Sequence, residues 1–365
     1  MNPLHTESNL KNIVKYAKEV GPRNASLIAR YTGIPPTTVR YSIRNLLVRR
    51  GIRFLASVSH PRLGLKRHLL SLSFDPSLQD PEGALRRMAT TAYLEWYGKT
   101  LPRGDYYALV AVPPRLQNRY LEFLEQLVES GFLRSFRSYE MDWFRFRSLD
   151  ENDYNFKRGR WEVDWGSLDK RKVHVEEPPA EPKRAFSPDS VDLLIIKELE
   201  LDATQRLSEL ARKLNLTYRT IYYHYTEHVV GQGLIKTYIV YPTPAYRSGE
   251  VTGVLHLLQG LSTDELVAAE NLFHRVPFTW MDGYGEEDRQ YVAYTGLPTS
   301  QVTKMFEFVS ERMAGLREKY SFELVSLAHS KGYTIPYEMI GKDGVWGFDS
   351  RRALQKVVAE PPRQS

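Results

Sequence analysis

The sequence contains no cysteine, which excludes disulfide bridges, thiolate metal sites and cysteine nucleophiles. It also lacks any apolar run approaching the roughly 18 residues that a membrane-spanning helix requires. The N-terminal stretch MNPLHTESNLKN holds no apolar core of the kind that a secretion signal needs. From these absences we expect a cytoplasmic protein with no membrane partner.

Acidic residues are missing from one long stretch of the chain. Between Val20 and Phe74 there is no Asp or Glu, although the whole chain has 44 of them among 365 residues. The same stretch carries ten cations: Arg23, Arg30, Arg40, Arg44, Arg49, Arg50, Arg53, Arg62, Lys66 and Arg67. The overall net charge of +6 is modest, so this uneven distribution is the stronger signal. It indicates a surface for a polyanion such as DNA, with a solvated basic face as the alternative.

An internal repeat runs through the whole chain. The segment SLIAR at Ser26–Arg30 resembles SELAR at Ser208–Arg212, an offset of 182. Two further anchors follow in the same order, at offsets of 184 and 185: Leu94-Glu-Trp96 with Phe278-Thr-Trp280, and the pattern Lys-x-Gly-x-Trp-x-x-Asp from Lys157 and from Lys342. Because the offsets drift by so little, we interpret the chain as two copies of one multidomain unit.

The repeat and the composition divide the chain into six parts. We expect the following boundaries: a winged helix-turn-helix in 1–62, an α+β domain with a C-terminal extension in 63–168, a charged, proline-containing linker in 169–185, a second winged helix-turn-helix in 186–243, a second α+β domain with extension in 244–355, and a tail in 356–365.

The first part predicts a three-helix DNA-binding unit. Apolar residues recur at helical spacing over 9–20 and 25–31, and Pro36 is placed to open a third helix. That helix buries Val39 and Ile43 and turns a polar face outward, toward the major groove of DNA. We expect residues 49–58 to form a two-stranded wing. The predicted DNA-binding residues of this unit are Thr37, Thr38, Arg40, Tyr41, Arg44, Arg49, Arg50 and Arg53.

The second copy repeats this pattern, with Ser187 predicted to cap its first helix. Its outward face carries Arg219, Tyr222 and Tyr223, and is more aromatic and less basic. DNA binding and protein packing are both open for this face. His224 and His228 lie four residues apart on the third helix and could bind a metal, but the sequence places no third ligand beside them. We therefore predict no metal site and no cofactor.

The remainder of each copy predicts the order βαββαβ, a ferredoxin-like unit. In the first copy the expected segments are 67–74, 81–92, 93–98, 106–112, 115–130 and 133–139. In the second they are 251–258, 263–273, 278–281, 290–294, 300–313 and 322–327. The predicted fold class is α+β, as two copies of a winged helix-turn-helix plus a ferredoxin-like domain.

A winged helix-turn-helix followed by βαββαβ resembles the Lrp/AsnC family of bacterial and archaeal transcription regulators. The resemblance covers roughly residues 8–140 and 187–328. A family turn of the type Gly-Asp-Tyr is matched by Gly104-Asp105-Tyr106, and Gly98 matches an earlier family glycine. The resemblance implies a small-molecule effector such as an amino acid, with Gly98, Gly104 and Asp105 as effector-binding or dimer-contact positions. A simple tight hairpin is the alternative reading of these residues.

Two features depart from the family pattern. The family has one copy per chain and dimerises by pairing α+β domains, so we expect the two copies here to pair within the chain, to form a homodimer, or both. Each copy also ends in an extension of about 30 residues that contains the repeated motif. We expect a glycine turn and a tryptophan docked on the body of the protein, with Asp164 and Asp349 as caps; a ligand site is the alternative.

The function predicted from the sequence is a DNA-binding transcription regulator, not an enzyme, that reads DNA mainly through its first helix-turn-helix. No Walker loop, Gly-x-Ser-x-Gly element or dinucleotide fingerprint is present. Two alternatives remain open. One is an enzyme similar to the siroheme decarboxylases, which are built from similar domains and use His and Arg on a tetrapyrrole. The other is an architectural protein that coats DNA with little specificity.

Overall fold

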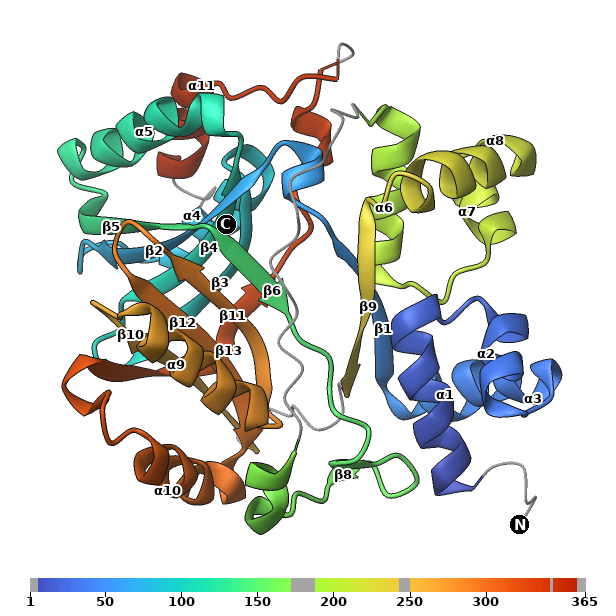
Figure 1. The fold of residues 1–365 in the computed structure, drawn as a ribbon. Helices are drawn as coiled ribbons and strands as arrows, with labels where there is room; N and C mark the ends of the chain where they lie inside the picture. Colours follow the sequence, from blue (N-terminus) through green and yellow to red (C-terminus); the bar gives the residue numbers. More distant parts are fainter. Residues whose placement is uncertain (1–5, 172–187, 243–249, 342–343, 360–365) are drawn as a thin grey trace.

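The computed structural model describes residues 6–171, 188–242, 250–341 and 344–359. Most of the predicted linker and part of the predicted tail lie outside these ranges. Two helical units lie on one side of the molecule and a large sheet with its helices on the other (Figure 1). This α+β architecture confirms the predicted fold class.

Each copy opens with the predicted three-helix unit. In the first copy these are α1 (Glu7–Val20), α2 (Ala25–Thr32) and α3 (Pro36–Tyr41), which continues as a wider π-helical turn (Ser42–Leu47). In the second they are α6 (Ser190–Leu201), α7 (Leu207–Lys213) and α8 (Tyr218–Tyr223), with a similar π-helical turn (His224–Val230). The capping residue of α6 is Asp189; the predicted cap Ser187 lies outside the described residues.

The predicted two-stranded wing is wrong. Residues Ile52–Val58 form one continuous strand, β1, which pairs antiparallel with β9 (Ile235–Pro242) of the other copy. Gly51, at φ +82°, turns the chain before the strand, and residues 52–58 contain no Gly, Pro, Asn or Asp that would fold them back on themselves. Phe54 and Val58 point into the core between the two helical units, so the strand pair joins the copies.

The ferredoxin-like units are confirmed in both copies. The first contains β2 (Lys66–Phe74), α4 (Pro81–Thr91), β3 (Leu94–Leu101), β4 (Tyr106–Val112), α5 (Gln117–Glu129) and β5 (Leu133–Met141). The second contains β10 (Val251–Leu258), α9 (Thr263–Arg275), β11 (Thr279–Gly285), β12 (Gln290–Pro298), α10 (Val302–Arg312) and β13 (Tyr320–Gly332). Several strands run a few residues beyond their predicted ends.

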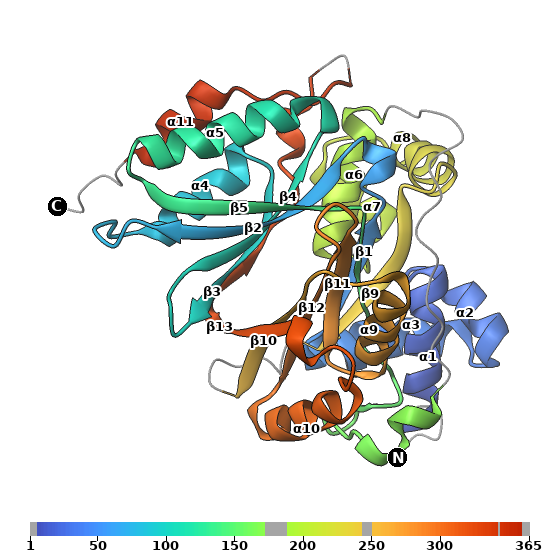
Figure 2. The same ribbon diagram turned by 60° about the vertical axis from the view of Figure 1, so that its left-hand side comes forward.

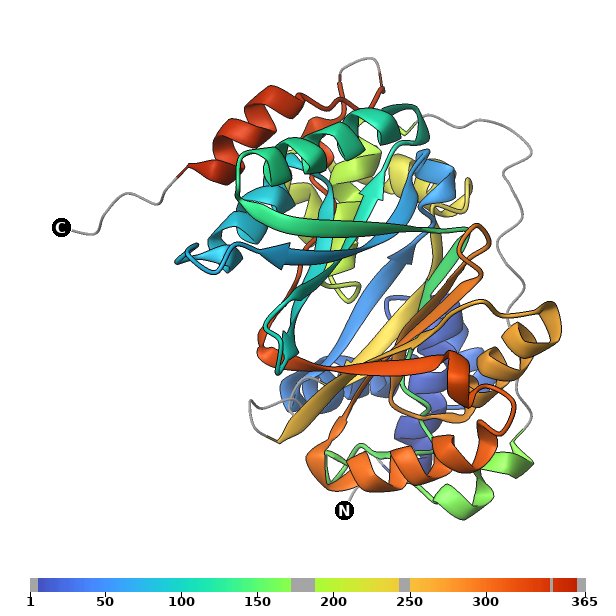
Figure 3. The same ribbon diagram turned by 90° about the vertical axis from the view of Figure 1, so that its left-hand side faces the viewer.

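The two ferredoxin-like units share one nine-stranded sheet, in the order β5-β2-β4-β3-β13-β10-β12-β11-β6. Strand β3 pairs with β13 at one seam, and the short strand β6 (Trp143–Phe146) pairs with β11 at the other. Since β5 runs directly into β6, one stretch of chain forms both edges of the sheet. The sheet curls around an apolar interior with the helices outside (Figures 2 and 3). The predicted pairing of the copies within one chain is therefore present.

The C-terminal extensions are exchanged between the copies. Trp161, in the small hairpin of β7 (Tyr154–Asn155) and β8 (Arg160–Trp161), packs on Phe278 of the second copy, with ring centroids 4.8 Å apart. Trp346 packs on Tyr93 of the first copy, and its indole N–H donates to the carbonyl of Leu63 at 2.7 Å. The expected tryptophan docking is confirmed.

Both predicted aspartate caps are also present. Asp164 caps a short 3-10 helix (Trp165–Lys170), and Asp349 caps α11 (Ser350–Val358). Helix α11, which the sequence analysis did not predict, extends three residues into the expected tail. Among the described helices, none has the length and apolar character that crossing a membrane requires.

Candidate functional site

The predicted effector residues lie at a seam and in a hairpin. Gly98 is on β3 beside β13, where an added Cβ atom would come within 2.6 Å of Val325. It therefore allows the two copies to approach each other, as a dimer-contact position would. Gly104, at φ +79°, makes the turn, and the Asp105 carbonyl accepts the N–H of Thr100 at 2.7 Å. The pocket described below is lined by other residues, and effector binding remains a prediction.

The predicted DNA-binding residues of both copies are on the helical units, and most of them are exposed: Thr37, Arg40, Tyr41, Arg49, Arg53, Arg219, Tyr222 and Tyr223. Thr38 is half-buried. Arg44 donates to the carbonyl of Thr204 at 3.2 Å, and Arg50 to that of Phe156 at 3.1 Å. Both of these arginines thus have protein partners.

The third helices of the two units, α3 and α8 with their π-helical turns, border one groove; they are called the recognition helices below. It is lined by Arg40 and Arg44 from the first copy and by Tyr218 and Tyr222 from the second, with Arg23 and Arg206 also on its wall. The structure therefore brings the two predicted reading faces together. Base or phosphate contacts by these residues remain a prediction.

A different pocket lies where the strand pair β1–β9 meets the curled sheet. Its walls are the ends of β1 and β9, the segment from Ser59 to Arg67 that leads into β2, and the strip Met141–Phe146 where β5 passes into β6. Its cavity is small, about 70 Å³, and it opens to solvent. Residues from both copies form it, because β9 belongs to the second copy and the other segments to the first.

Beside this pocket, three charged or polar side chains form a buried cluster: His60, Arg67 and Glu95, each less than a tenth exposed. His60 Nε2 lies 2.5 Å from Glu95 Oε1, and Arg67 Nε donates to Glu95 Oε2 at 2.8 Å. Arg67 Nη2 is 3.2 Å from His60 Nε2. His60 and Arg67 line the pocket directly, and Glu95 on β3 holds both of them from behind.

The charges of the cluster follow from its burial and its pairing. Burial opposes ionisation of Glu95, but the neighbouring Arg67 and His60 outweigh it and lower the pKa of Glu95 to about 2. Burial and the charge of Arg67 lower the pKa of His60, which favours the neutral ring. Since Nε2 faces an ionised carboxylate at 2.5 Å, we assign the single ring proton to Nε2.

Aromatic rings and cations surround the cluster. The Arg67 guanidinium lies 5.0 Å from the ring centroids of both Phe144 and Phe146. Among the residues that line the pocket, four are cationic and one is acidic: Lys66, Arg67, Arg145 and Lys236 against Asp142. Arg145 donates to both oxygens of Asp282 at 2.8 Å, which orients it beside Trp143. A cavity of this size suits one carboxylate-bearing side chain of a ligand, held beside aromatic surface.

The carboxyl of Glu200, on α6, lies near the cluster. Burial, with a smaller contribution from the charge of Glu95, raises the pKa of Glu200 to about 8, against a hydrogen bond from Tyr337. The Tyr337 hydroxyl donates to Glu200 Oε2 at 2.6 Å. Glu200 does not line the pocket. It can store a proton near the site at neutral pH.

Sequence analysis did not find this cluster. No known motif has the spacing of these residues, because they come from separate elements. His60 follows β1, Arg67 is on β2, Glu95 is on β3 and Glu200 is on α6 of the second copy. The one available signal was the position of His60 and Arg67 at the end of the acid-free stretch, which was assigned to DNA.

The fold defines a protein with two helix-turn-helix units and two ferredoxin-like units in one chain. No family model matches the sequence, and no curated protein matches it. Among solved structures, the siroheme decarboxylase NirDL is similar over 96% of this chain and 98% of its own, with 13% identity and a TM-score of 0.56. NirDL in complex with an iron-uroporphyrin III analogue covers 96% and 99%, with 13% identity and a TM-score of 0.53.

Regulators of the predicted family match only part of the chain. AsnC from E. coli covers 39% of this protein and 93% of its own chain, with 13% identity and a TM-score of 0.28, a likeness too low to support an argument. The prediction that the protein is not an enzyme is overturned, because the fold that matches over nearly the full length is that of an enzyme.

Proposed function

We propose that this protein is an enzyme that removes carbon dioxide from a carboxylate-bearing tetrapyrrole, the reaction class of the siroheme decarboxylase NirDL. The observation that carries the proposal is the buried His60–Arg67–Glu95 cluster under an aromatic strip. It is supported by the similarity of fold to NirDL over 96% of the chain. Siroheme, with its iron, is the proposed substrate.

The pocket accounts for substrate binding in two ways. Trp143, Phe144 and Phe146 offer apolar surface to the edge of a flat macrocycle. Arg67, fixed by Glu95, is preorganised to bind the carboxylate that reacts, whereas Lys66 and Arg145 are already paired with Glu140 and Asp282.

The reaction needs one proton and no oxidant. As the carboxylate of an acetate side chain leaves as carbon dioxide, the electron pair of the broken C–C bond stays on the side-chain carbon. That carbon then takes a proton and becomes a methyl group. Glu95 is ionised, and neither Arg67 nor a neutral imidazole acts as an acid at neutral pH, so the proton comes from solvent. His60 passes it on: the ring takes a second proton from water before the step and returns to its neutral form when the side-chain carbon is protonated. Glu95 positions both residues.

The test is anaerobic incubation of the full chain with siroheme. We expect a change in the macrocycle absorbance on binding and, by mass spectrometry, a product that has lost carbon dioxide. His60→Gln should bind the macrocycle but lose turnover, and Arg67→Lys should weaken binding and slow turnover, because lysine cannot reproduce the planar fork. Arg317→Lys, at an exposed site, is the matched control. An unchanged spectrum together with an unchanged substrate mass would contradict the proposal.

The DNA-binding regulator is a second candidate, favoured by one observation. The groove between the recognition helices carries Arg23, Arg40, Arg44 and Arg206 on its walls. Four cations and four tyrosines in one groove suit a polyanion. The test of this candidate is selection from random DNA by the wild type and by the Arg40→Ala/Arg44→Ala variant.

A further inference from the structure

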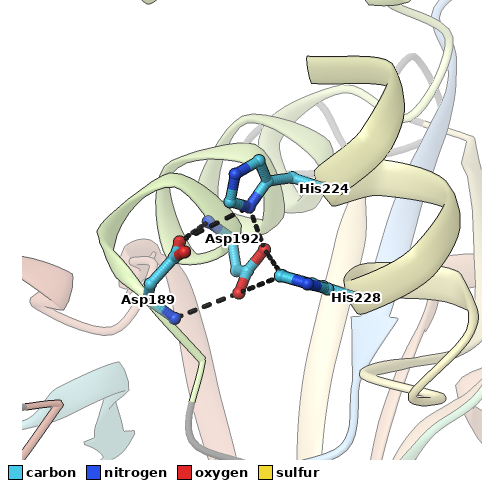
Figure 4. Close-up of side chains that lie close together, drawn as sticks. All are labelled: Asp189, Asp192, His224 and His228. Atoms are coloured by element: carbon cyan, nitrogen blue, oxygen red, sulfur yellow. Dashed lines mark hydrogen bonds and ion pairs between the residues drawn. The ribbon is translucent and has the colours of Figure 1, made fainter. Parts of the chain in front are cut away.

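A second cluster of polar side chains lies in the second helical unit, away from the pocket. Asp189 and Asp192 stand at the start of α6, and His224 and His228 stand on the π-helical turn that continues α8 (Figure 4). One ligand atom from each of the four residues lies within 4.8 Å of the other three. The histidine pair is the one singled out from the sequence, and the structure supplies the partners that the sequence did not place beside it.

The two histidines present the same atom to one carboxylate. His224 Nδ1 is 2.8 Å and His228 Nδ1 3.0 Å from Oδ1 of Asp192, and His224 Nδ1 is 3.6 Å from Oδ1 of Asp189. Zinc bonds of 2.0–2.1 Å in a tetrahedron place neighbouring ligand atoms about 3.3 Å apart. These three separations bracket this value. Since all four ligand atoms lie within 4.8 Å of one another, no pair has to close by more than about 1.5 Å around a metal ion.

The surroundings orient the ligands as metal sites require. The Asp192 side chain is 1% exposed and also accepts the backbone N–H of Asp189 at 3.0 Å, which fixes the carboxylate. The Tyr223 ring packs edge-on against both imidazoles, at 5.6 and 5.2 Å. Asp189 is 52% exposed and gives the site an entrance from solvent.

The first copy provides an internal comparison. At the repeat offset of 182, Asp192, His224 and His228 correspond to Leu10, Ser42 and Leu46. Leu10 and Ser42 are buried, and Leu10 and Leu46 belong to the apolar core of that unit. The same fold is thus built with apolar packing at this place. In the second copy a buried carboxylate and two imidazoles, from two different helices, occupy this place. Each of these three groups requires a polar partner, which apolar packing does not.

We infer that Asp189, Asp192, His224 and His228 bind a divalent transition-metal ion, with zinc as the best fit, through two imidazole nitrogens and two carboxylate oxygens. This donor set suits zinc, and also cobalt and nickel, rather than magnesium or calcium, which take oxygen ligands. The ion ties the first helix of the second unit to its recognition helix. The role is structural, since four protein ligands complete a tetrahedral zinc site.

The test is metal binding to the full chain, purified metal-free and without a histidine tag. We expect calorimetry to give one zinc ion per chain, and cobalt to give the absorption bands of a tetrahedral site. His224→Gln should weaken zinc binding by more than the roughly 10–100-fold that loss of an outer partner produces. Asp189→Asn, which keeps a good helix cap, should weaken it as well.

The control is His329→Gln, which removes a histidine that faces a carboxylate, Glu82, at a 50% exposed site elsewhere. It should leave zinc binding unchanged. Absence of stoichiometric binding by the wild-type chain would overturn the inference, as would equal affinity in folded His224→Gln. Cobalt spectra of the wild-type chain show whether a tetrahedral metal site forms even where a variant fails to fold. None of these measurements depends on enzymatic activity.

Discussion

His60 and Glu95 face each other across 2.5 Å, although 35 residues separate them in the sequence and both are less than a tenth exposed. Arg67 shares the same carboxylate. One glutamate therefore neutralises a buried guanidinium and fixes the proton of an imidazole, so the cluster depends on its single negative charge.

Replacing that charge should be costly for stability. Glu95→Gln leaves Arg67 buried without an ionised partner, and breaking a buried pair in this way costs roughly 3–5 kcal/mol. Urea unfolding measures the change. Glu125→Gln, at an exposed position of α5, is the control and should stay within about 0.5 kcal/mol of wild type. A Glu95→Gln chain as stable as this control would show that the pair contributes nothing.

Glu200 should make stability depend on pH in the neutral range. Its pKa is raised to about 8 in the folded chain from an ordinary value near 4.5, so its stabilising effect is full below pH 4.5 and is lost as the pH rises through 8. Glu200→Gln removes this titration. Between pH 6 and 9 the urea midpoint of the wild type should fall relative to that of the variant. Glu307→Gln, on the exposed face of α10, should follow the wild type, and parallel curves for Glu200→Gln would disprove the assignment.

The sequence predicted the elements of the fold well because their signals are local. The spacing of Leu10, Ile13 and Val14 predicts α1, and the predicted order βαββαβ is observed in both copies. The wing was predicted wrongly because the partner of β1 is β9, which lies in the other copy. The lack of Gly, Pro, Asn or Asp in residues 52–58 counts against a hairpin, but no local pattern identifies the distant strand β9 as the partner.

The candidate sites were harder to predict because their residues, like the partners β1 and β9, are far apart in the sequence. His60, Arg67 and Glu95 meet only after β2 and β3 take their places in the sheet, and Glu200 joins them from the second copy. The acid-free stretch was read as a DNA surface because the sequence does not show that Arg67 is buried. The pair His224 and His228 was visible in the sequence, whereas Asp192, 32 residues before His224, was not recognisable as their partner.

The exchanged tryptophans should hold the two copies together. Trp346 is 6% exposed and packs on Tyr93 of the other copy, so Trp346→Ala should cost about 3–5 kcal/mol. The neighbouring Val345→Ala, 43% exposed, should cost less than about 0.5 kcal/mol. Calorimetry of the Trp346→Ala chain should show the transition moving to lower temperature. An unchanged transition would mean that the exchanged extension does not stabilise the body.

Arg40 and Arg44 separate the two candidate functions, because they line the groove between the recognition helices and lie outside the pocket of His60. The variant Arg40→Ala/Arg44→Ala should leave siroheme binding and decarboxylation unchanged if the proposed enzyme is correct. The regulator prediction expects instead that the wild type enriches a defined site from random DNA and that the variant loses it, with a cost of about 1–3 kcal/mol where Arg44 reads a base. Equal loss on all DNA sequences would mark phosphate contacts.

Arg44 already binds the Thr204 carbonyl and lies 3.8 Å from Glu209, so reading a base would require it to leave both partners. We therefore expect tetrapyrrole turnover to survive the double substitution, and its loss would place the reaction in the groove rather than in the pocket.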